Sequence, residues 1–398
     1  MNEKKTPAIR FQGFTDDWED HKLGDVFQEY SEKNHEELPV LTIVQGKGTV
    51  LRDESNRNLQ YDKSSLSNYK MVKKDDFIVH LRSFEGGFEK ANSNGIISPA
   101  YHTLHGDDTD SSFYYPFFRS KNFIECLLKP HVYGIRDGKS IDIEGMRTID
   151  IPVPSFAEQQ KIGGYLDQVD YLITLHQRKL TKLQLLKKSM LTKMFPKDGA
   201  RVPEIRFQGF HKNWENLLFD DAVNISNDMV DPKAGSFDKL IHIGPGDIES
   251  HTGQLLPGIK TVSESHLISG KFRFYKGDII YSKIRPELSK CVIAPTDGLA
   301  SADAYILHCN KEMWQDFLYC ILQTKHFYKY ATSISMRTGM PKINREELGR
   351  YFFLAPSVKE QQLIGAFFTD LDHLISLHQR KLSKLQQIKQ AMLSKLFV

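Results

Sequence analysis

Cysteine is scarce in this sequence, and long apolar runs are absent. The 398 residues include four cysteines (Cys126, Cys291, Cys309 and Cys320), none at Cys-x-x-Cys spacing. So few thiols argue against a disulfide scaffold and favour a reduced, cytoplasmic protein. No apolar run approaches the roughly 18 residues that a membrane span needs. Because residues 1–10 are polar and charged, we also expect no signal peptide.

Sequence patterns of catalysis are missing as well. The chain has no G-x-x-x-x-G-K-[ST], H-E-x-x-H, G-x-S-x-G or G-x-G-x-x-G motif, so four unrelated classes of active site are not predicted. It also lacks the Asn-Pro-Pro-Tyr tetrapeptide of adenine methyltransferases and a Pro-Asp…Glu-x-Lys nuclease cluster. The pairs His102/His105 and His308/Cys309 have no companions at metal-ligand spacing. We therefore expect a non-catalytic chain without a metal or cofactor of its own.

What the sequence does contain is an internal repeat. Residues 7–14 read Pro-Ala-Ile-Arg-Phe-Gln-Gly-Phe and residues 203–210 read Pro-Glu-Ile-Arg-Phe-Gln-Gly-Phe, each followed by a tryptophan (Trp18 and Trp214). Residues 158–195 return at 360–397 with 22 of 38 positions identical. Two globular modules therefore alternate with two helices. The predicted domains are residues 1–157 and 199–357 for the modules, and 158–198 and 358–398 for the helices.

The two repeated segments have the pattern of long helices. Ser155 with Glu158, and Ser357 with Glu360, match the S-x-x-E capping box. Apolar residues in steps of three and four predict a coiled-coil seam, and a helix about 57 Å long with so narrow a stripe needs a partner helix. The simplest partner is its own repeat, packed antiparallel. The expected seam and docking residues are Ile162, Leu166, Val169, Ile173, Leu180 and Leu183, with Ile364, Phe368, Leu371, Ile375, Leu382 and Leu385.

The modules combine strand-like and helix-like stretches. Apolar, β-branched runs predict strands, and longer mixed stretches predict helices. The fold class is therefore α+β, with two pseudo-repeated globular domains separated by two long antiparallel coiled-coil helices. The expected strands include 40–44, 77–81, 279–282 and 304–307, and the expected helices include 113–128 and 314–331.

The formal net charge of +3 is unevenly distributed. The modules sum to −5 and +1, whereas segments 158–198 and 358–398 carry +4 and +3. Six basic residues and no acidic one lie between Tyr171 and Phe195, and five and none between His373 and Val398. One interpretation is a solvated face on each helix. The other is a basic ridge that faces phosphates or an acidic partner.

Some basic residues of the modules occupy loop-like positions that recur in both copies. Arg82 and Arg285 both come straight after a predicted strand, and arginine can bind a guanine edge through two hydrogen bonds. The alternative for each such residue is an ordinary surface charge. The candidate nucleic-acid contacts are His80, Arg82, Arg136 and Lys139 in the first module, and Lys283, Arg285, Arg337 and Lys342 in the second.

Taken together, these motifs resemble the specificity subunit of type I restriction–modification systems. The resemblance is carried by the two Ile-Arg-Phe-Gln-Gly-Phe…Trp openings and the two Pro-Ser-x-x-Glu-Gln-Gln-x-Ile helix starts. Two segments of the second module, 276–286 and 338–343, are similar to segments of target recognition domains. The first module departs from that pattern, with Ser83-Phe84 after Arg82 where the second has Pro286 after Arg285.

The resemblance implies that each module is a target recognition domain that reads one half of a bipartite duplex DNA site. The helices would set the distance between the half-sites and dock two methyltransferase subunits, which would carry S-adenosylmethionine and flip out an adenine. Motor-nuclease (restriction) subunits would join for cleavage. Two alternatives remain open: a coiled-coil scaffold with protein-binding modules, and an enzyme whose catalytic motif has no recognised pattern. The bases that the modules read are not encoded in any motif of the sequence.

Overall fold

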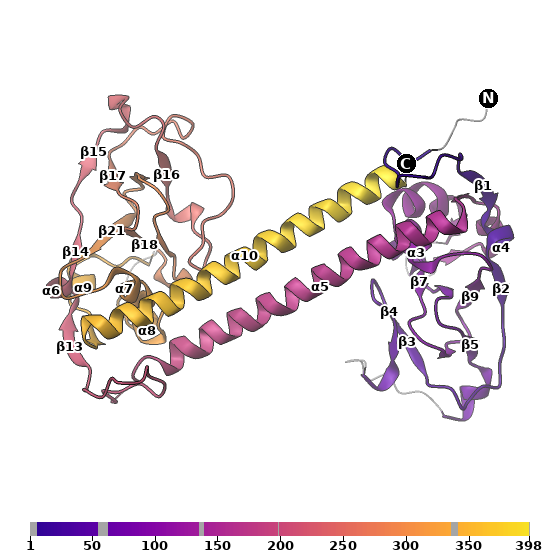
Figure 1. Cartoon of the computed structure of the whole chain (residues 1–398), viewed down its shortest axis with the longest axis horizontal. Coiled ribbons are helices and arrows are strands. Elements are labelled where there is room, and N and C mark those ends of the chain that lie inside the picture. Colours follow the sequence, from indigo (N-terminus) through magenta and orange to yellow (C-terminus); the bar gives the residue numbers. More distant parts are fainter. Residues whose placement is uncertain (1–5, 55–62, 135–138, 198, 336–340, 398) are drawn as a thin grey trace. The chain divides into compact units, whose positions relative to one another are not determined.

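A computed structural model describes residues 6–54, 63–134, 139–197, 199–335 and 341–397. The chain divides into two compact units, and each unit contains one module together with parts of both long helices (Figure 1). Unit 1 comprises residues 1–177 and 380–398, and unit 2 comprises residues 178–379. No helix in the described ranges is both long and apolar enough to cross a membrane.

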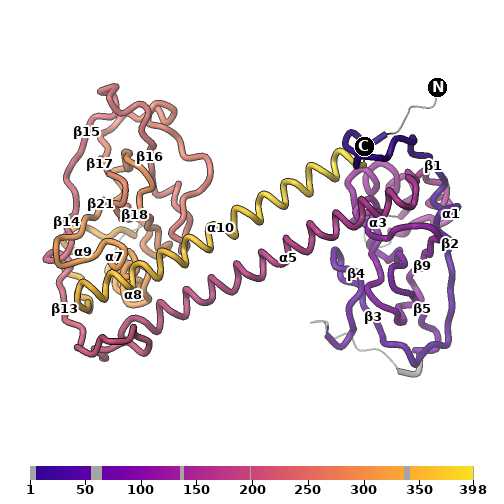
Figure 2. The backbone as a smooth tube through the Cα atoms, viewed as in Figure 1, coloured from indigo at the N-terminus to yellow at the C-terminus, as the bar shows by residue number. Residues whose placement is uncertain are grey.

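The two predicted long helices are confirmed. Helix α5 (Phe156–Lys193) begins in unit 1 and ends in unit 2, and α10 (Val358–Leu396) does the reverse. Within unit 1, residues from the start of α5 and from the end of α10 share one hydrophobic core, and Figure 2 shows the backbones of these two helix ends side by side. The two helices therefore run antiparallel there. The core residues concerned are Ile162, Leu166, Leu396 and Phe397.

Unit 2 repeats this arrangement with the roles of the helices exchanged. The end of α5 and the start of α10 meet in one core, which also contains Trp214 and Phe317 of the second module. Burial of apolar surface contributes roughly 25 cal/mol for each Å² removed from water, so each module is anchored to one end of each helix. The residues that α5 and the two positions after it contribute to this core include Leu183, Met190, Met194 and Phe195, and those of α10 include Ile364, Phe368 and Leu371.

The first module is built on a four-stranded antiparallel sheet in the order β2-β9-β6-β7. Three two-stranded sheets surround it, namely β1-β12, β3-β4 and β5-β8, and a short pair β10-β11 follows α3 in the chain. Its strands are β1 (Glu19–Lys22), β2 (Gln28–Tyr30), β3 (Leu41–Val44), β4 (Gly48–Leu51), β5 (Lys70–Val72), β6 (Phe77–Val79), β7 (Glu89–Lys90), β8 (Gly95–Ile97), β9 (His102–His105), β10 (Val132–Tyr133), β11 (Ser140–Ile141) and β12 (Asp150–Val153). Its helices are α1 (Leu23–Val26), α2 (Ser83–Gly86), α3 (Ser111–Phe118), η3 (Phe123–Leu128) and α4 (Ile143–Arg147).

The second module has an antiparallel sheet of the same topology, in the order β14-β21-β18-β19. A second sheet, β15-β17-β20-β16, contains the parallel pair β16-β20, and β13 pairs with β22 as β1 pairs with β12. The strands are β13 (Glu215–Leu218), β14 (Val223–Ile225), β15 (Met229–Val230), β16 (Ile241–Ile243), β17 (Lys271–Phe274), β18 (Ile279–Ser282), β19 (Cys291–Ile293), β20 (Gly298–Ala300), β21 (Ala304–Cys309) and β22 (Phe352–Ala355). The helices are α6 (Phe219–Ala222), α7 (Gln315–Leu322), α8 (Lys325–Ser335) and α9 (Arg345–Gly349).

Both stretches expected as single helices are divided in two. Segment 113–128 becomes α3 and η3, and segment 314–331 becomes α7 and α8. A hydroxyl side chain explains each break, because Ser120 Oγ accepts the N–H of Phe123 (3.0 Å) and Thr324 Oγ1 accepts the N–H of Phe327 (3.3 Å). Such N-cap bonds start a new helix. The strand predictions hold, with β18 matching 279–282 and β3, β6 and β21 overlapping the other three runs.

Candidate nucleic-acid interface and helix clamps

The loop after β18 brings three of the predicted second-module residues together. Ile284 pairs with Lys342 in an isolated β-bridge, and the N–H of Arg285 donates to the carbonyl of Pro341 (2.8 Å). The N–H of Ile343 in turn donates to the carbonyl of Lys283 (2.9 Å). Segments 283–285 and 341–343 thus lie side by side and share one basic surface.

The three cations of that surface have different surroundings. The Lys283 ammonium donates to the carbonyl of Ala302 and lies over the Tyr305 ring, 5.8 Å from its centroid. Burial, and then the nearby charge of Lys342, lower the pKa of Lys283. Arg285 and Lys342 are exposed. Lys283 therefore shapes the loop, while Arg285 and Lys342 can reach a ligand.

Arg285 also has an unusual backbone. Its φ of 50° lies in the left-handed region, and the next residue, Pro286, is buried. A non-glycine residue in this region is disfavoured by roughly 1–3 kcal/mol unless its surroundings hold it there. Here the bond to Pro341 provides that restraint. Backbone strain of this kind clusters at binding sites, which supports Arg285 as a candidate contact residue.

The corresponding loop of the first module follows β6. The side chain of Arg82 is 69% exposed, and its own N–H donates to His80 Nδ1 (3.3 Å). Burial lowers the pKa of His80, which therefore acts as a neutral acceptor that positions this turn. The Lys139 ammonium lies 5.5 Å from the centroid of the Phe84 ring, two residues beyond Arg82 in the chain. The structure thus brings Lys139 to the Arg82 loop.

Two predicted residues, Arg136 and Arg337, lie outside the described residues. One feature that the sequence analysis missed is Phe84, whose ring holds Lys139. Its signal was weak, because an isolated aromatic after a strand is more often part of a core. Leu81, next to Arg82 in the chain, is 64% exposed, and Tyr133, which pairs with Ser140 beside Lys139, is 59% exposed, so exposed apolar groups accompany these cations.

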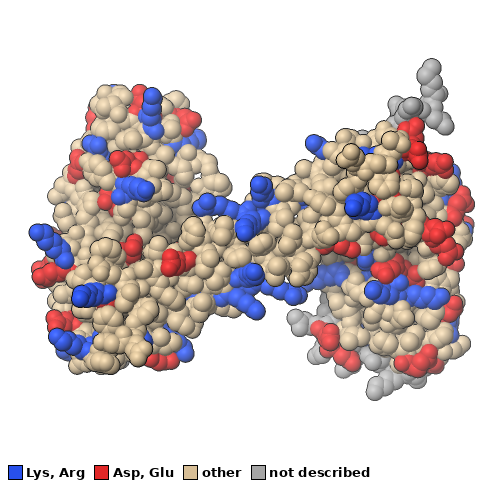
Figure 3. Space-filling view, in the orientation of Figure 1, with Lys and Arg blue, Asp and Glu red and all other residues tan. Residues whose placement is uncertain are grey.

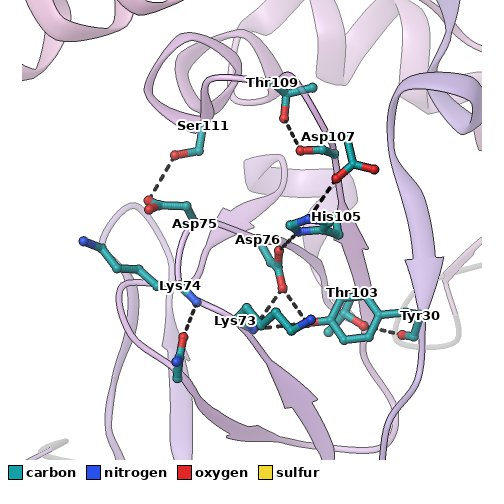
Figure 4. A network of polar contacts seen from close by, with 12 residues as sticks. Tyr30, Lys73, Lys74, Asp75, Asp76, Thr103, His105, Asp107, Thr109 and Ser111 are labelled. Atoms are coloured by element: carbon teal, nitrogen blue, oxygen red, sulfur yellow. Dashed lines mark hydrogen bonds and ion pairs between the residues drawn. The ribbon is translucent and has the colours of Figure 1, made fainter.

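An aspartate–histidine pair lies at the start of the strand that precedes each arginine loop, β6 in the first module and β18 in the second. In the first, Asp76 precedes β6 and accepts from His105 at the end of β9 (Nδ1 to Oδ1, 2.6 Å; Figure 4). In the second, Asp278 precedes β18 and lies 3.0 Å from Nδ1 of His308 in β21. This hydrogen bond raises the pKa of His308. Each pair joins neighbouring strands, and within the described residues no group of three or more His, Cys, Asp and Glu is placed to hold a metal ion.

Within each unit, the opening motif binds the motif at the start of a long helix. Arg10 of the first opening forms two 2.7 Å hydrogen bonds to the buried carboxylate of Glu158, at the start of α5. Arg206 of the second opening forms the same pair of bonds to Glu360 of α10. The capping-box expectation gave these glutamates another role, back-bonding to the helix N-cap. In the structure they hold an arginine instead, because two bonds to a guanidinium satisfy a buried carboxylate better than one to a backbone N–H.

The next motif residues clamp each module to its helix. The side chain of Gln159 accepts the N–H of Asp110 at the start of α3, and that of Gln361 accepts the N–H of Trp314 before α7 (both 2.9 Å). A Cβ at Gly163 would lie 2.4 Å from Asp110 Oδ1, so only glycine permits this approach. The Glu-Gln-Gln-x-Ile-Gly motif thus encodes a contact between helix and module.

Most of the predicted seam residues are buried inside the chain itself. Those near the helix ends are at most 5% exposed, namely Ile162, Leu166, Val169, Ile364, Phe368, Leu371 and Ile375. Those farther along, namely Ile173, Leu180, Leu183, Leu382 and Leu385, are half-buried. An additional protein would therefore meet other residues of the helices, among them the exposed Tyr171, Leu172, Leu374 and Leu377.

Comparison with known proteins identifies the family to which this chain belongs. Residues 15–185 and 233–387 match the family described as "Type I restriction modification DNA specificity domain". The chain belongs to this family. The match covers most of both modules and most of both helices, and the resemblance expected from the two repeated motifs is confirmed. Two copies of the specificity domain in one chain account for the internal repeat.

Curated members of the type I specificity family align over much of their length. The Escherichia coli "Type I restriction enzyme EcoDI specificity subunit" is 28% identical over 317 residues, covering 71% of this chain and 70% of that protein. The MjaVIII specificity subunit of Methanocaldococcus jannaschii is 22% identical over 393 residues, covering 95% and 92%. A crystal structure of the type I S subunit from M. genitalium shares the fold, with a TM-score of 0.65, 17% identity and 99% of each chain covered.

Proposed function

We propose that this specificity subunit reads a bipartite duplex DNA site, with one half-site bound by each module. The observation that carries the proposal is the repeated placement of an exposed arginine, Arg82 or Arg285, after the same strand of the same four-stranded sheet. Specific DNA contacts are made by side chains that reach base edges from a rigid scaffold. Because the two modules differ in nearly all loop residues, the two half-sites would differ in sequence.

The long helices would set the distance between the half-sites. A helix of 38 residues is about 57 Å long, which suits half-sites separated by more than one turn of DNA, about 34–36 Å. Leu172 and Leu175 of α5 recur as Leu374 and Leu377 of α10, and all of these side chains are exposed except Leu175, which is half-buried. Equivalent surfaces suit two copies of one partner, and we infer that these are methyltransferase subunits.

In this arrangement, the partner subunits would carry out methylation and cleavage. The methyltransferase subunits would bind S-adenosylmethionine and modify an adenine, and motor-nuclease subunits would join for cleavage in the cytoplasm. The chain itself would be non-catalytic. Support for this division of labour comes from membership of the specificity family and from the absence of recognised catalytic motifs in the sequence.

The test combines genome sequencing with binding. Methylation-sensitive long-read sequencing of the host should show a bipartite methylated motif that disappears when this gene is deleted. A duplex with that motif should then bind the chain plus methyltransferase subunit more tightly than a scrambled duplex, at stated salt. Equal binding of both duplexes would contradict the proposal and favour a protein-binding scaffold. Methylation or cleavage by the chain alone would contradict the non-catalytic assignment.

A further inference from the structure

Each long helix carries the same group of three cations, here called the basic triplet. In α5 it is Arg178, Lys179 and Lys182, and in α10 it is Arg380, Lys381 and Lys384. All six side chains are exposed, whereas the leucines between them (Leu180 and Leu382) are half-buried. Figure 3 shows Lys and Arg side chains gathered along the helices, with few acidic ones among them.

Three other lysines of these helices are already paired with carboxylates. Lys187 binds Asp372, Lys389 binds Asp170, and Lys193 binds Glu204, at 2.6, 2.6 and 3.1 Å. By contrast, among the described residues no carboxylate lies within ion-pair distance of Arg178, Lys179, Lys182, Lys381 or Lys384. No acidic residue follows Asp170 in α5 or Asp372 in α10. The fold therefore pairs Lys187, Lys389 and Lys193 with carboxylates and leaves these five triplet cations without a carboxylate partner among the described residues.

We propose that the basic triplets bind backbone phosphates of duplex DNA, as a sequence-independent site separate from the reading loops. This inference rests on the proposed function, because it assigns the triplets to the DNA between or beside the half-sites. Arg178 and Lys182, like Arg380 and Lys384, are one helical turn apart, about 6 Å along the axis. That spacing lets one helix face present two cations to neighbouring phosphates of one strand.

Phosphate fits these side chains better than an acidic protein surface does. Four of the six cations are lysines, and lysine is depleted at protein–protein interfaces, where aromatic residues and arginine are enriched. Protein–DNA interfaces are far more positively charged, and their phosphate contacts come largely from Lys and Arg. The low net charge of the modules, −5 and +1, also leaves the helices as the main source of positive field in the chain.

The test measures how DNA affinity depends on salt. Each phosphate contact releases counterions and contributes about 0.9 to the slope of log K against log salt concentration. The full chain is titrated with a 30-bp scrambled duplex, followed by fluorescence anisotropy, at several sodium chloride concentrations. The variant Lys182→Gln/Lys384→Gln removes one cation from each triplet. The control Lys161→Gln/Lys359→Gln removes two exposed lysines nearer the helix starts, so that the net charge changes equally.

The expected result is a slope smaller by about 1–2 for the triplet variant and an unchanged slope for the control. A wild-type slope in the triplet variant overturns the proposal, and so does an equal decrease in both variants, which would reflect net charge alone. Loss of methyltransferase-subunit binding with an intact slope would assign the triplets to an acidic protein and also overturn it. If the wild-type complex does not prefer the motif duplex, the proposed function is contradicted, but the slope measurement still tests the phosphate site.

Discussion

The ammonium of Lys187 in α5 lies 2.6 Å from Oδ1 of Asp372 in α10 and also donates to Oε1 of Gln323 at 2.7 Å. The repeat reproduces this pair in unit 1, where Lys389 of α10 lies 2.6 Å from Asp170 of α5. Each lysine lies four residues beyond a seam leucine, Leu183 or Leu385, and so continues the same helix face. An ion pair between antiparallel helices therefore marks the seam within each unit. A polar seam residue can fix the register of packed helices, as it does in coiled coils.

Replacing Lys187 with methionine should destabilise unit 2. The side chains of Lys187 and Asp372 are only 11% and 29% exposed, and burial already raises the pKa of Asp372. An unpaired, half-buried carboxylate should lower the free energy of unfolding by about 1–3 kcal/mol. The matched change Lys389→Met affects a pair that is 30% and 50% exposed, so its effect should stay below about 1 kcal/mol. Urea unfolding of both variants measures the difference, and equal effects would contradict this account.

Loss of Arg206 should be more severe, because Glu360 is buried beneath it. The two side chains are 12% and 1% exposed, and breaking such a pair costs about 3–5 kcal/mol. The double variant Arg206→Met/Glu360→Gln should recover much of that loss, since a neutral amide is less penalised by burial than a carboxylate. Thermal unfolding of the single and double variants provides the measurement. Lys22→Met, which breaks a pair that is 49% and 52% exposed, is the control.

The stability of unit 2 should depend on pH through His308. Its hydrogen bond to Asp278 raises its pKa above the ordinary value of 6.5, so the folded state favours the protonated imidazole. The stabilisation is then fully present below about pH 6.5, and it is lost as the pH rises through the higher folded pKa. His308→Gln should flatten the pH dependence of unfolding above about pH 6.5. The variant of the exposed His211, His211→Gln, should retain it, and a His308→Gln profile like that of the wild type would contradict the prediction.

Arg285→Ala should change which DNA is methylated more than it changes stability. If Arg285 reads a guanine, its loss should weaken binding by about 1–3 kcal/mol and relax one base position of the motif. The substitution should not relieve the strain of the left-handed backbone at φ 50°, because alanine is as restricted in that region as arginine. Long-read methylation sequencing of a host carrying the variant reports the motif. An unchanged motif would remove Arg285 from the reading residues.

Much of the architecture was predictable because it repeats. The nearly identical segments 158–195 and 360–397 carried both a helical period and a helix start, and the structure has helices at those places. Position-specific partners were less predictable. The S-x-x-E pattern predicted that Glu158 caps its own helix, whereas the residue binds Arg10, which lies 148 positions away in the sequence. Local patterns do not contain such distant partners.

In the candidate site too, some features were predictable from the sequence and others were not. The sequence marked Arg82 and Arg285 by their equal positions after a strand, and the structure leaves both exposed. It did not indicate that Lys283 is held by Ala302 and Tyr305 while Lys342 stays exposed. The partners of Lys283 lie in β21 or just before it, and Lys342 is positioned by pairing with Ile284, nearly sixty residues away, so neither arrangement follows from local sequence.

The sequence by itself determined the duplication, the two long helices and the family resemblance, because repeats and helical periods are properties of residue order. Tertiary structure alone decided which cations are already neutralised. Lys187 and Lys389 face an aspartate of the other helix, whereas Lys182 and Lys384 of the same basic runs have no such partner among the described residues. The physical reason is that an ion pair needs two charges within about 4 Å, and that distance is set by packing and not by spacing along the chain.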